Sequence, residues 1–248
     1  MRIRLDKWLS HQGLGSRKEV NALIRAGRVR VNGTTITVPK HIVEESDSVQ
    51  YDTNDVAFPR YAYFLLHKPK GVLSATRDKR QTVLDLLRTE DRFRPLFPVG
   101  RLDMDTTGLL LLTDDGRLAH ALLSPRRHVE KEYYAELDIP IDEALIADFA
   151  KGILLEPEGI LTKPAHLFLR EDGRVSVTIT EGKYHQVKRM FAAGNRKVLS
   201  LHRHRMGPLV LDADLPEGEY RPLREEEIEQ LRLAAGQRPE GGLGSEER

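Results

Sequence analysis

The residues best suited to chemistry lie in the segment Gly100-Arg101-Leu102-Asp103. Four consecutive leucines, Leu109 to Leu112, predict a short buried strand just beyond it, so Asp103 is expected immediately outside that strand. If residues 101 to 103 are extended, the side chains of Arg101 and Asp103 point to the same side and share a cleft. A carboxylate beside a cation stays ionised at neutral pH. Taken alone, these four residues favour the simpler interpretation, a surface ion pair in a loop.

Two other interpretations of this segment have specific weaknesses. Asp103, Asp105, Thr107 and Gly108 match the opening of a calcium-binding loop, but the leucines that follow would stand where that loop needs oxygen ligands. Asp103-Met104-Asp105 also resembles the nucleophile segment of haloacid-dehalogenase-like phosphatases, in which an unbroken apolar strand precedes the first aspartate. Here residues 98–101 interrupt such a strand. Phosphoryl transfer remains a minor alternative, because no second acidic magnesium cluster is evident downstream.

Two further runs bring chemically useful side chains to regular elements. Residues 129–137 alternate like a strand, which places Lys131, Tyr133 and Ala135 on one face. Tyr133 is then either a platform on which a base stacks or a half-buried strand aromatic. Residues 186–192 predict a helix with an apolar stripe opposite Lys188. His185 opens that basic helix. We interpret it as a hydrogen-bonding or packing residue in preference to a general base.

The first forty residues predict a helix, a second helix and a hairpin. The first helix is expected from Ile3 onwards, Ser16 caps the second, and Asn32-Gly33 is a strong hairpin signal. This order resembles the RNA-binding module named after ribosomal small-subunit protein four. An ordinary solvated surface is the alternative for its charges. On the RNA-binding interpretation, the residues that contact phosphates are Arg4, Lys7, Arg17, Lys18, Arg25, Arg28 and Arg30.

The rest of the chain predicts a mixture of helices and strands. Residues 44–61 lose hydrophobic periodicity and read as a linker, and a new core begins at Tyr61. Asp142 is expected to cap a helix that runs to Lys151, and residues 167–169 and 175–179 form a hairpin. Periodicity alone therefore gives an α+β fold class.

Composition and charge limit the possible functions. The 248 residues include no cysteine, which excludes disulfides and thiolate catalysis. No apolar run approaches the ~20 residues of a membrane helix, and the first residues lack a signal-peptide core, so we expect a cytoplasmic protein with no membrane partner. Residues 1–43 hold nine Lys and Arg against two carboxylates, and residues 183–205 hold seven against none. These two basic blocks predict a polyanionic partner.

Several motifs together resemble the RsuA/RluB-type ribosomal pseudouridine synthases, and they do so over nearly the whole chain. They are Lys68-Pro69-Lys70-Gly71, Gly100-Arg101-Leu102-Asp103, Thr106-Thr107-Gly108-Leu109, Lys131-Glu132-Tyr133 and residues 181–190. Residues 161–165, 184–191 and 218–223 are most similar to the RsuA branch, which modifies small-subunit (16S) ribosomal RNA. Residues 193–197 depart from the family pattern, because the glycine comes one place early and the loop is more charged.

The resemblance implies a fold, an activity and a set of site residues. The expected fold is α+β: a small helix-helix-hairpin RNA-binding domain at 1–57, a catalytic domain at 58–231 with a bent, mostly antiparallel mixed sheet flanked by helices, and a disordered tail at 232–248. The implied activity is isomerisation of a uridine to pseudouridine, which requires neither cofactor nor metal. The implied catalytic residues are Asp103, its partner cation Lys188, and the base-stacking Tyr133. RNA contacts are expected from Arg101, which fills the place of the extruded base, and from Lys68, Lys70, Lys131, Lys183, His185 and Arg189.

Partners follow from the same resemblance. The expected substrate is ribosomal RNA or a ribosome-assembly intermediate, bound by a monomeric enzyme. A non-catalytic RNA-binding or ribosome-assembly factor remains the alternative, because its basic patches would look the same and only the carboxylate distinguishes the two.

Overall fold

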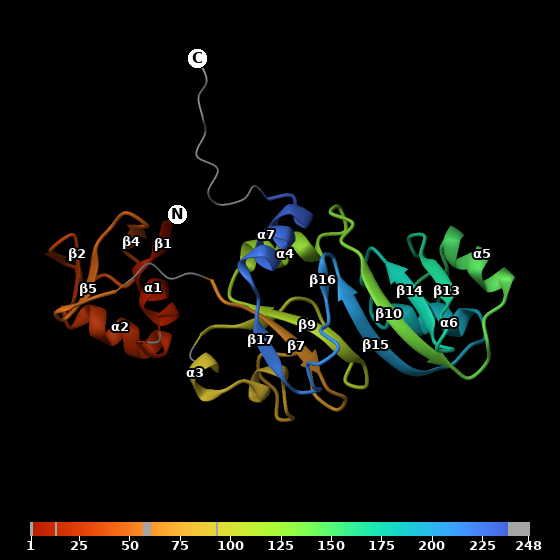
Figure 1. The fold of residues 1–248 in the computed structure, drawn as a ribbon. Coiled ribbons are helices and arrows are strands. Elements are labelled where there is room, and N and C mark those ends of the chain that lie inside the picture. The colour runs from red at the N-terminus through yellow and green to blue at the C-terminus, as the bar shows by residue number, and fades with distance from the viewer. Residues whose placement is uncertain (1, 13, 57–60, 93, 238–248) are drawn as a thin grey trace, which may run out of the picture. The chain divides into compact units, whose positions relative to one another are not determined.

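The computed structural model describes residues 2–12, 14–56, 61–92 and 94–237 (Figure 1). The chain divides into two compact units. The smaller unit contains residues 1–62 together with 87–96, and the larger contains residues 63–86 together with 97–248. The boundary expected near residue 57 and most of the expected tail, residues 238–248, lie outside the described residues.

The smaller unit combines two helices with short strands. Helices α1 (Leu5–His11) and α2 (Arg17–Arg25) cover a core that includes Trp8 and Ile24, both at most 1% exposed. Helix α3 (Thr89–Arg92) is contributed by the distant segment. The strands form one pair and one four-stranded sheet: β1 (Arg2–Arg4) with β4 (Ile42–Glu44), and β3 (Thr34–Thr35), β2 (Val29–Val31), β5 (Val49–Tyr51) and β6 (Asn54–Asp55) in that order.

Sequence reasoning about this unit was right in part. Ser16 caps α2 through a capping box with Glu19, as its sequence position predicts. The prediction that the first helix includes Ile3 is wrong, because Ile3 pairs with Val43 in a strand. The prediction of a linker at residues 44–61 is wrong where β5 and β6 lie. These strands are too short to show periodicity in the sequence, and they form because β5 pairs with β2 and β6 pairs with β5.

The larger unit is built on one sheet, in which nine strands pair among the described residues. Its main path is β13 (His166–Leu169), β14 (Val175–Ile179), β10 (Lys131–Leu137), β15 (Val198–Met206), β9 (Thr107–Thr113), β7 (Tyr63–Lys68) and β17 (Tyr220–Pro222), with β16 (Leu209–Val210) on β15 and β8 (Phe97–Pro98) on β9. Only the β15–β9 contact among these pairs is parallel. The expected α+β class with a mostly antiparallel mixed sheet is confirmed.

Helices and short turns surround this sheet. They are η1 (Val83–Leu86), α4 (Gly116–Leu123), α5 (Glu143–Lys151), α6 (Gln186–Ala193) and α7 (Glu225–Ala234), and β11 (Leu154–Leu155) pairs with β12 (Ile160–Leu161) beside them. The expected buried strand is β9, whose four leucines are fully buried. Asp142 caps α5 by accepting a hydrogen bond from the Leu145 amide at 2.8 Å. Phe149 of α5 contacts Phe191 of α6 with ring centroids 5.0 Å apart, which packs the two helices together.

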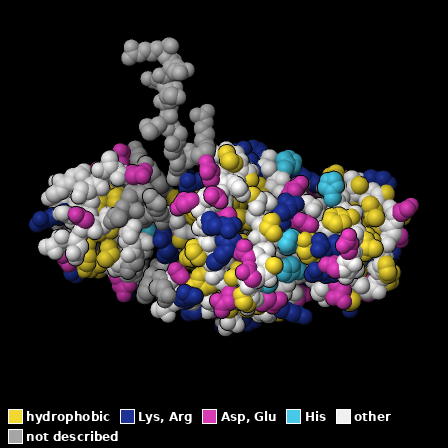
Figure 2. All heavy atoms as spheres, in the orientation of Figure 1, with side chains coloured by type: hydrophobic (Ala, Val, Ile, Leu, Met, Phe, Trp, Pro, Cys, Tyr) yellow, Lys and Arg dark blue, Asp and Glu magenta, His cyan; other side chains and the backbone are white. Residues whose placement is uncertain are grey.

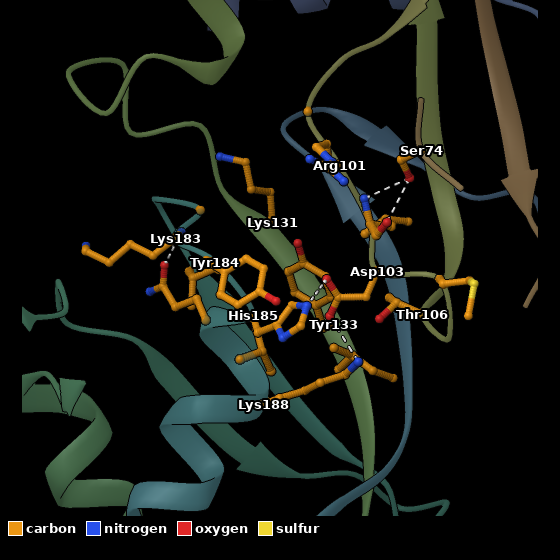
Figure 3. Close-up of a pocket in the computed structure, with 18 of the residues that line it drawn as sticks. Ser74, Arg101, Asp103, Thr106, Lys131, Tyr133, Lys183, Tyr184, His185 and Lys188 are labelled. Atoms are coloured by element: carbon orange, nitrogen blue, oxygen red, sulfur yellow. Dashed lines mark hydrogen bonds and ion pairs between the residues drawn. The ribbon is translucent and has the colours of Figure 1, made fainter. Parts of the chain in front are cut away.

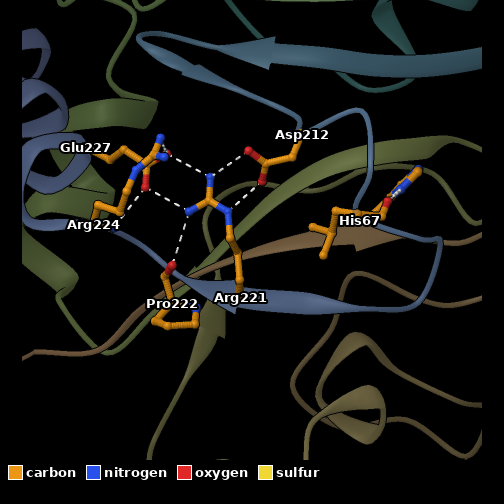
Figure 4. A network of polar contacts seen from close by, with 7 residues as sticks. His67, Asp212, Arg221, Pro222, Arg224 and Glu227 are labelled. Atoms are coloured by element: carbon orange, nitrogen blue, oxygen red, sulfur yellow. Dashed lines mark hydrogen bonds and ion pairs between the residues drawn. The ribbon is translucent and has the colours of Figure 1, made fainter.

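An arginine network holds the C-terminal helix to the sheet (Figure 4). The Arg221 guanidinium on β17 donates to both oxygens of Asp212 and, at 2.8 Å each, to both oxygens of Glu227 on α7. Hydrogen bonds from Arg221 lower the pKa of Glu227 to about 2. Because α7 continues to Ala234, the prediction that the disordered tail starts at residue 232 is wrong for residues 232–234.

The two faces of β10 differ in burial. Lys131, Tyr133 and Ala135 are buried on one face, while the residues between them are less buried on the other. On the side of the larger unit seen in Figure 2, basic, acidic and histidine side chains are interspersed. Within the described ranges, no helix combines the length and apolar character needed to cross a bilayer.

Candidate active site

A cavity of about 720 Å³ opens in the larger unit and brings together three predicted segments. Its lining includes the loop with Arg101 and Asp103, the β10 residues Lys131 and Tyr133, and the turn into α6 with residues 182–188. In Figure 3 the side chains of Tyr133, His185 and Lys188 converge on Asp103. Segments far apart in sequence therefore meet around one carboxylate.

The loop that carries Asp103 is fixed through its backbone. Ser74 Oγ donates to the Leu102 carbonyl at 2.8 Å and accepts from the Leu102 amide at 3.0 Å. The Gly71 amide donates to the Met104 carbonyl at 2.7 Å, and the Thr106 amide donates to the Asp103 carbonyl at 3.1 Å. These bonds satisfy the polar backbone groups on both sides of Asp103 and so limit the positions its carboxylate can take.

Lys68 supports the same loop through hydrogen bonds to its backbone. Its side chain is fully buried, and its ammonium donates to the carbonyls of Pro69, Met104 and Thr106. Burial lowers the pKa of Lys68 to about 8. The prediction that Lys68 contacts RNA does not fit this position, because the ammonium is enclosed and already bonded to three carbonyl oxygens.

Gly108 permits the close approach that joins the loop to the sheet. It pairs with Arg203 in the parallel β9–β15 contact and has a φ of +107°. A Cβ at this position would lie 2.2 Å from the Arg203 carbonyl oxygen. Any residue with a side chain would have to push β15 away, so glycine is required here for steric reasons.

Asp103 is contacted by Lys188 of α6 and by His185 of the turn before that helix. Lys188 Nζ lies 3.0 Å from Asp103 Oδ2 and 2.5 Å from Asp105 Oδ1. Although burial opposes it, hydrogen bonding to Asp105 and Asp103 raises the pKa of Lys188. The hydrogen bond from Lys188 lowers the pKa of Asp105. One ammonium thus pairs with two carboxylates.

The cation beside Asp103 is not the one expected from local spacing. Among the described residues no ion pair joins Arg101 to Asp103, and Arg101 is an exposed residue on the cavity wall. His185 lies there instead, with Nε2 3.3 Å from Asp103 Oδ1. The predicted sharing of one cleft by Arg101 and Asp103 is confirmed, but the predicted ion pair between them is wrong. Lys188 and His185 reach Asp103 through tertiary folding.

Tyr133 and Lys131 line the cavity from the buried face of β10, as strand alternation predicts. Tyr133 is 8% exposed, and in the described part of the chain no aromatic ring or guanidinium lies over it. Lys131 is 6% exposed and donates to the Val129 carbonyl at 2.9 Å. Burial lowers the pKa of Lys131 to about 8. Both residues are therefore largely buried and contribute to the cavity lining.

The remaining predicted RNA contacts are scattered. Lys183 lines the cavity but pairs with Glu181, and Arg189 pairs with Glu158 outside it. Lys70 is exposed and does not line the cavity. In the smaller unit, Arg4 and Arg17 pair with the buried Asp6, and Arg28 pairs with Asp52. Of the cations predicted there to contact RNA, those that are exposed and show no ion pair among the described residues are Lys7, Lys18, Arg25 and Arg30.

Sequence reasoning missed three residues at the site. Ser74 clamps the Asp103 loop, Asp105 shares Lys188, and Tyr184 stacks on His185 at the cavity wall. An isolated serine in a loop carries no signal of its role. Asp105 and Tyr184 stand inside motifs that were recognised. The pairing of Asp105 with Lys188 joins distant segments, and the place of Tyr184 on the cavity wall is set by the fold.

Comparisons with known proteins point to one family. The RNA pseudouridylate synthase family matches residues 62–193, and the S4 domain matches residues 3–49. An RNA pseudouridine synthase of Bacillus subtilis is 46% identical over 92% of this chain and 98% of its own length. Ribosomal small subunit pseudouridine synthase A of Escherichia coli is 44% identical over 91% of this chain and 98% of its own. A pseudouridylate synthase crystal structure matches with a TM-score of 0.66 and 41% identity, covering 92% of this chain and 99% of the other.

Proposed function

The chain belongs to the RNA pseudouridylate synthase family, and from that membership we propose that it converts one uridine of small-subunit (16S) ribosomal RNA to pseudouridine. Relatives named ribosomal small subunit pseudouridine synthase A support this substrate, since they are 44 to 46% identical along nearly the whole chain. The observation that carries the chemistry is the Asp103 carboxylate, held in a cavity by Lys188 beside the face of Tyr133.

The reaction moves the uracil ring without loss of any atom. The bond between ribose C1′ and uracil N1 breaks, the uracil rotates, and a bond forms between C1′ and C5. A proton leaves C5, and N1 gains one, so nothing is oxidised or reduced. Asp103 acts at the ribose by one of two routes: as a nucleophile at C1′ or as a base at C2′.

Each neighbour of Asp103 has a distinct task in this proposal. Lys188 pairs with the carboxylate and orients it, and Asp105 holds the ammonium in place from the other side. Tyr133 offers its ring face to the target uracil. Because the target base must leave its helix to reach the cavity, Arg101, exposed on the cavity wall, fills the vacated position.

The smaller unit adds RNA affinity. Its match to the S4 domain and its exposed cations support a role in holding phosphates. The enzyme would act on ribosomal RNA or on an assembly intermediate, as a monomer, in the cytoplasm. The domain limits proposed for the enzyme are 1–57 for this RNA-binding part and residue 58 to the end of α7 at Ala234 for catalysis.

The test is direct. Wild-type protein is incubated with 16S and with 23S ribosomal RNA transcripts without added cofactor, and pseudouridine is mapped by carbodiimide-dependent stops of reverse transcription. We expect one new stop, in the 16S transcript. A stop that appears only in 23S RNA would overturn the proposed substrate, and no stop in either naked RNA or ribosomal assembly particles would overturn the activity.

A further inference from the structure

Tyr184 is an aromatic side chain that the catalytic proposal does not use. It is 74% exposed, although large aromatic side chains usually bury most of their surface. Its ring lies nearly parallel to that of His185, with centroids 3.8 Å apart and planes 20° apart. Since His185 covers one face of the ring and most of the residue stays exposed, the other face is open to solvent.

The turn that carries these two rings is built rigidly. His185 has a left-handed backbone with a φ of 48°, a conformation that residues other than glycine seldom adopt. The Gln186 side chain fixes the turn by accepting from the Lys183 amide at 2.9 Å and donating to Glu181 at 2.9 Å. The stacked pair is thus held in place before any ligand arrives.

The surroundings of the pair fit a nucleic acid base. Tyr184 lines the same cavity as Asp103 and Tyr133, and its partner His185 approaches Asp103 (Figure 3). Lys188 and the exposed Arg101 line the same cavity, which places positive charge near the stacked pair and favours a polyanion. An open aromatic face beside cations is the combination that binds unpaired bases.

We propose that Tyr184 and His185 form a second base-stacking site, which takes the unpaired nucleobase next to the target uridine while the target itself stacks on Tyr133. This inference rests on the proposed function, because it assumes an RNA substrate. When the target leaves its helix, the neighbouring base loses a stacking partner. Tyr184 replaces that partner and continues the stack onto His185, next to the catalytic carboxylate.

The experiment uses the full chain and a short single-stranded RNA in which one uridine is flanked on each side by 2-aminopurine, whose fluorescence is quenched by stacking. We expect Tyr184→Ala to bind about tenfold more weakly and to lose the quenching at one flanking position. Tyr184→Phe keeps the ring face and should retain both properties. Phe168→Ala, which removes an exposed ring outside the cavity, should bind like wild type.

The outcomes separate this site from the proposed function. Wild-type affinity and quenching in Tyr184→Ala would overturn the stacking site, and so would an equal loss in Phe168→Ala. A loss in Tyr184→Phe as large as in Tyr184→Ala would also overturn it, since the hydroxyl would then be responsible. If Tyr184-dependent quenching occurs but no ribosomal RNA gains pseudouridine, the proposed function fails and the stacking site stands.

Discussion

Strand β10 places two adjacent tyrosines on opposite faces of the sheet, and their surroundings differ. Tyr133 faces the cavity, and no described ring or guanidinium lies over it. Tyr134 on the other face is stacked on His204, with centroids 4.6 Å apart, and the Arg170 guanidinium lies 3.9 Å from its centroid. The outer face thus supplies Tyr134 with partners from the protein itself, whereas the cavity face leaves Tyr133 available to a ligand.

Two arginines repeat this difference, while Lys183 and Lys188 in the cavity are paired with carboxylates. On the outer face Arg205 pairs with Glu130 at 3.0 Å and with Glu132 at 3.1 Å. On the cavity wall Arg101 is exposed and has no ion pair among the described residues. A face that satisfies its own polar groups contributes to stability, and a face that leaves them unsatisfied is suited to binding. Four predictions test this distinction, in order of decreasing effect.

The largest effect is expected from Asp103→Asn. The amide has nearly the same shape but is neither nucleophilic nor basic, so pseudouridine formation should fall about a thousandfold or more while RNA affinity changes little. Single-turnover assays on the substrate RNA measure the rate of pseudouridine formation, and filter binding measures RNA affinity. Activity within tenfold of wild type would contradict the assignment.

Asp105→Asn is the matched control for that variant. It removes the second carboxylate from Lys188 but leaves the ion pair between Lys188 and Asp103. We expect a loss below about tenfold, since the reacting carboxylate is unchanged. A loss equal to that of Asp103→Asn would mean that the two carboxylates act as one unit.

The two tyrosines should separate binding from stability. Tyr133→Ala should weaken RNA binding by ~1 to 3 kcal/mol through loss of base stacking, whereas Tyr133→Phe should bind almost normally. Tyr134→Ala should leave RNA binding within about twofold of wild type and lower the free energy of unfolding by ~1 kcal/mol, because it loses the stack with His204 and Arg170. Equal binding losses at the two positions would remove the contrast between the faces.

The outer face should also make stability depend on pH through His202. Burial, with further contributions from His67, His204 and Arg174, lowers the pKa of His202 to about 4. The unfolded chain has an ordinary histidine pKa near 6.5, so it binds more protons between pH 6.5 and 4. The contribution of His202 to the free energy of unfolding is therefore fully present above pH 6.5. It falls by about 2 kcal/mol as the pH drops toward 4.

His202→Gln tests this pH dependence. Urea unfolding followed by circular dichroism at pH 7.5 and at pH 4.5 should show a smaller difference for the variant than for wild type. Pseudouridine formation at neutral pH should change little, since His202 does not line the cavity. An unaltered pH dependence in the variant would assign the acid sensitivity to other groups.

The smallest effects are expected from substitution of single cations in the smaller unit. Each of Lys18→Gln, Arg25→Gln and Arg30→Gln should reduce the slope of log affinity against log salt by ~0.7 to 0.9 if the residue contacts a phosphate. The pair Arg28→Gln with Asp52→Asn removes an existing ion pair and should change the slope less. Affinities measured by filter binding at several salt concentrations decide between these outcomes. A larger change in slope for the Arg28 and Asp52 variant would contradict the expectation that cations already paired within the protein do not bind RNA.

Local patterns in the sequence predicted many of the elements that carry the site. The leucines of β9, the cap of α5 by Asp142 and the alternation of β10 all arise from neighbours within a few residues, and each appears where expected. Alternation even assigned Lys131 and Tyr133 to the same face. These features are predictable because burial and capping act over one or two turns of chain.

The tertiary structure alone decided the partners within the site. Lys188 meets Asp105 across 83 positions of sequence, and Ser74 clamps Leu102 from another loop. Local spacing instead suggested Arg101 as the partner of Asp103, whereas the family resemblance implied Lys188 as that partner and placed the buried Lys68 among the RNA contacts. The actual pairing depends on the β15–β9 register and on the close approach at Gly108, which fix where α6 and its preceding turn stand relative to the loop. Such contacts form only when the whole sheet is assembled, so no stretch of sequence specifies them by itself.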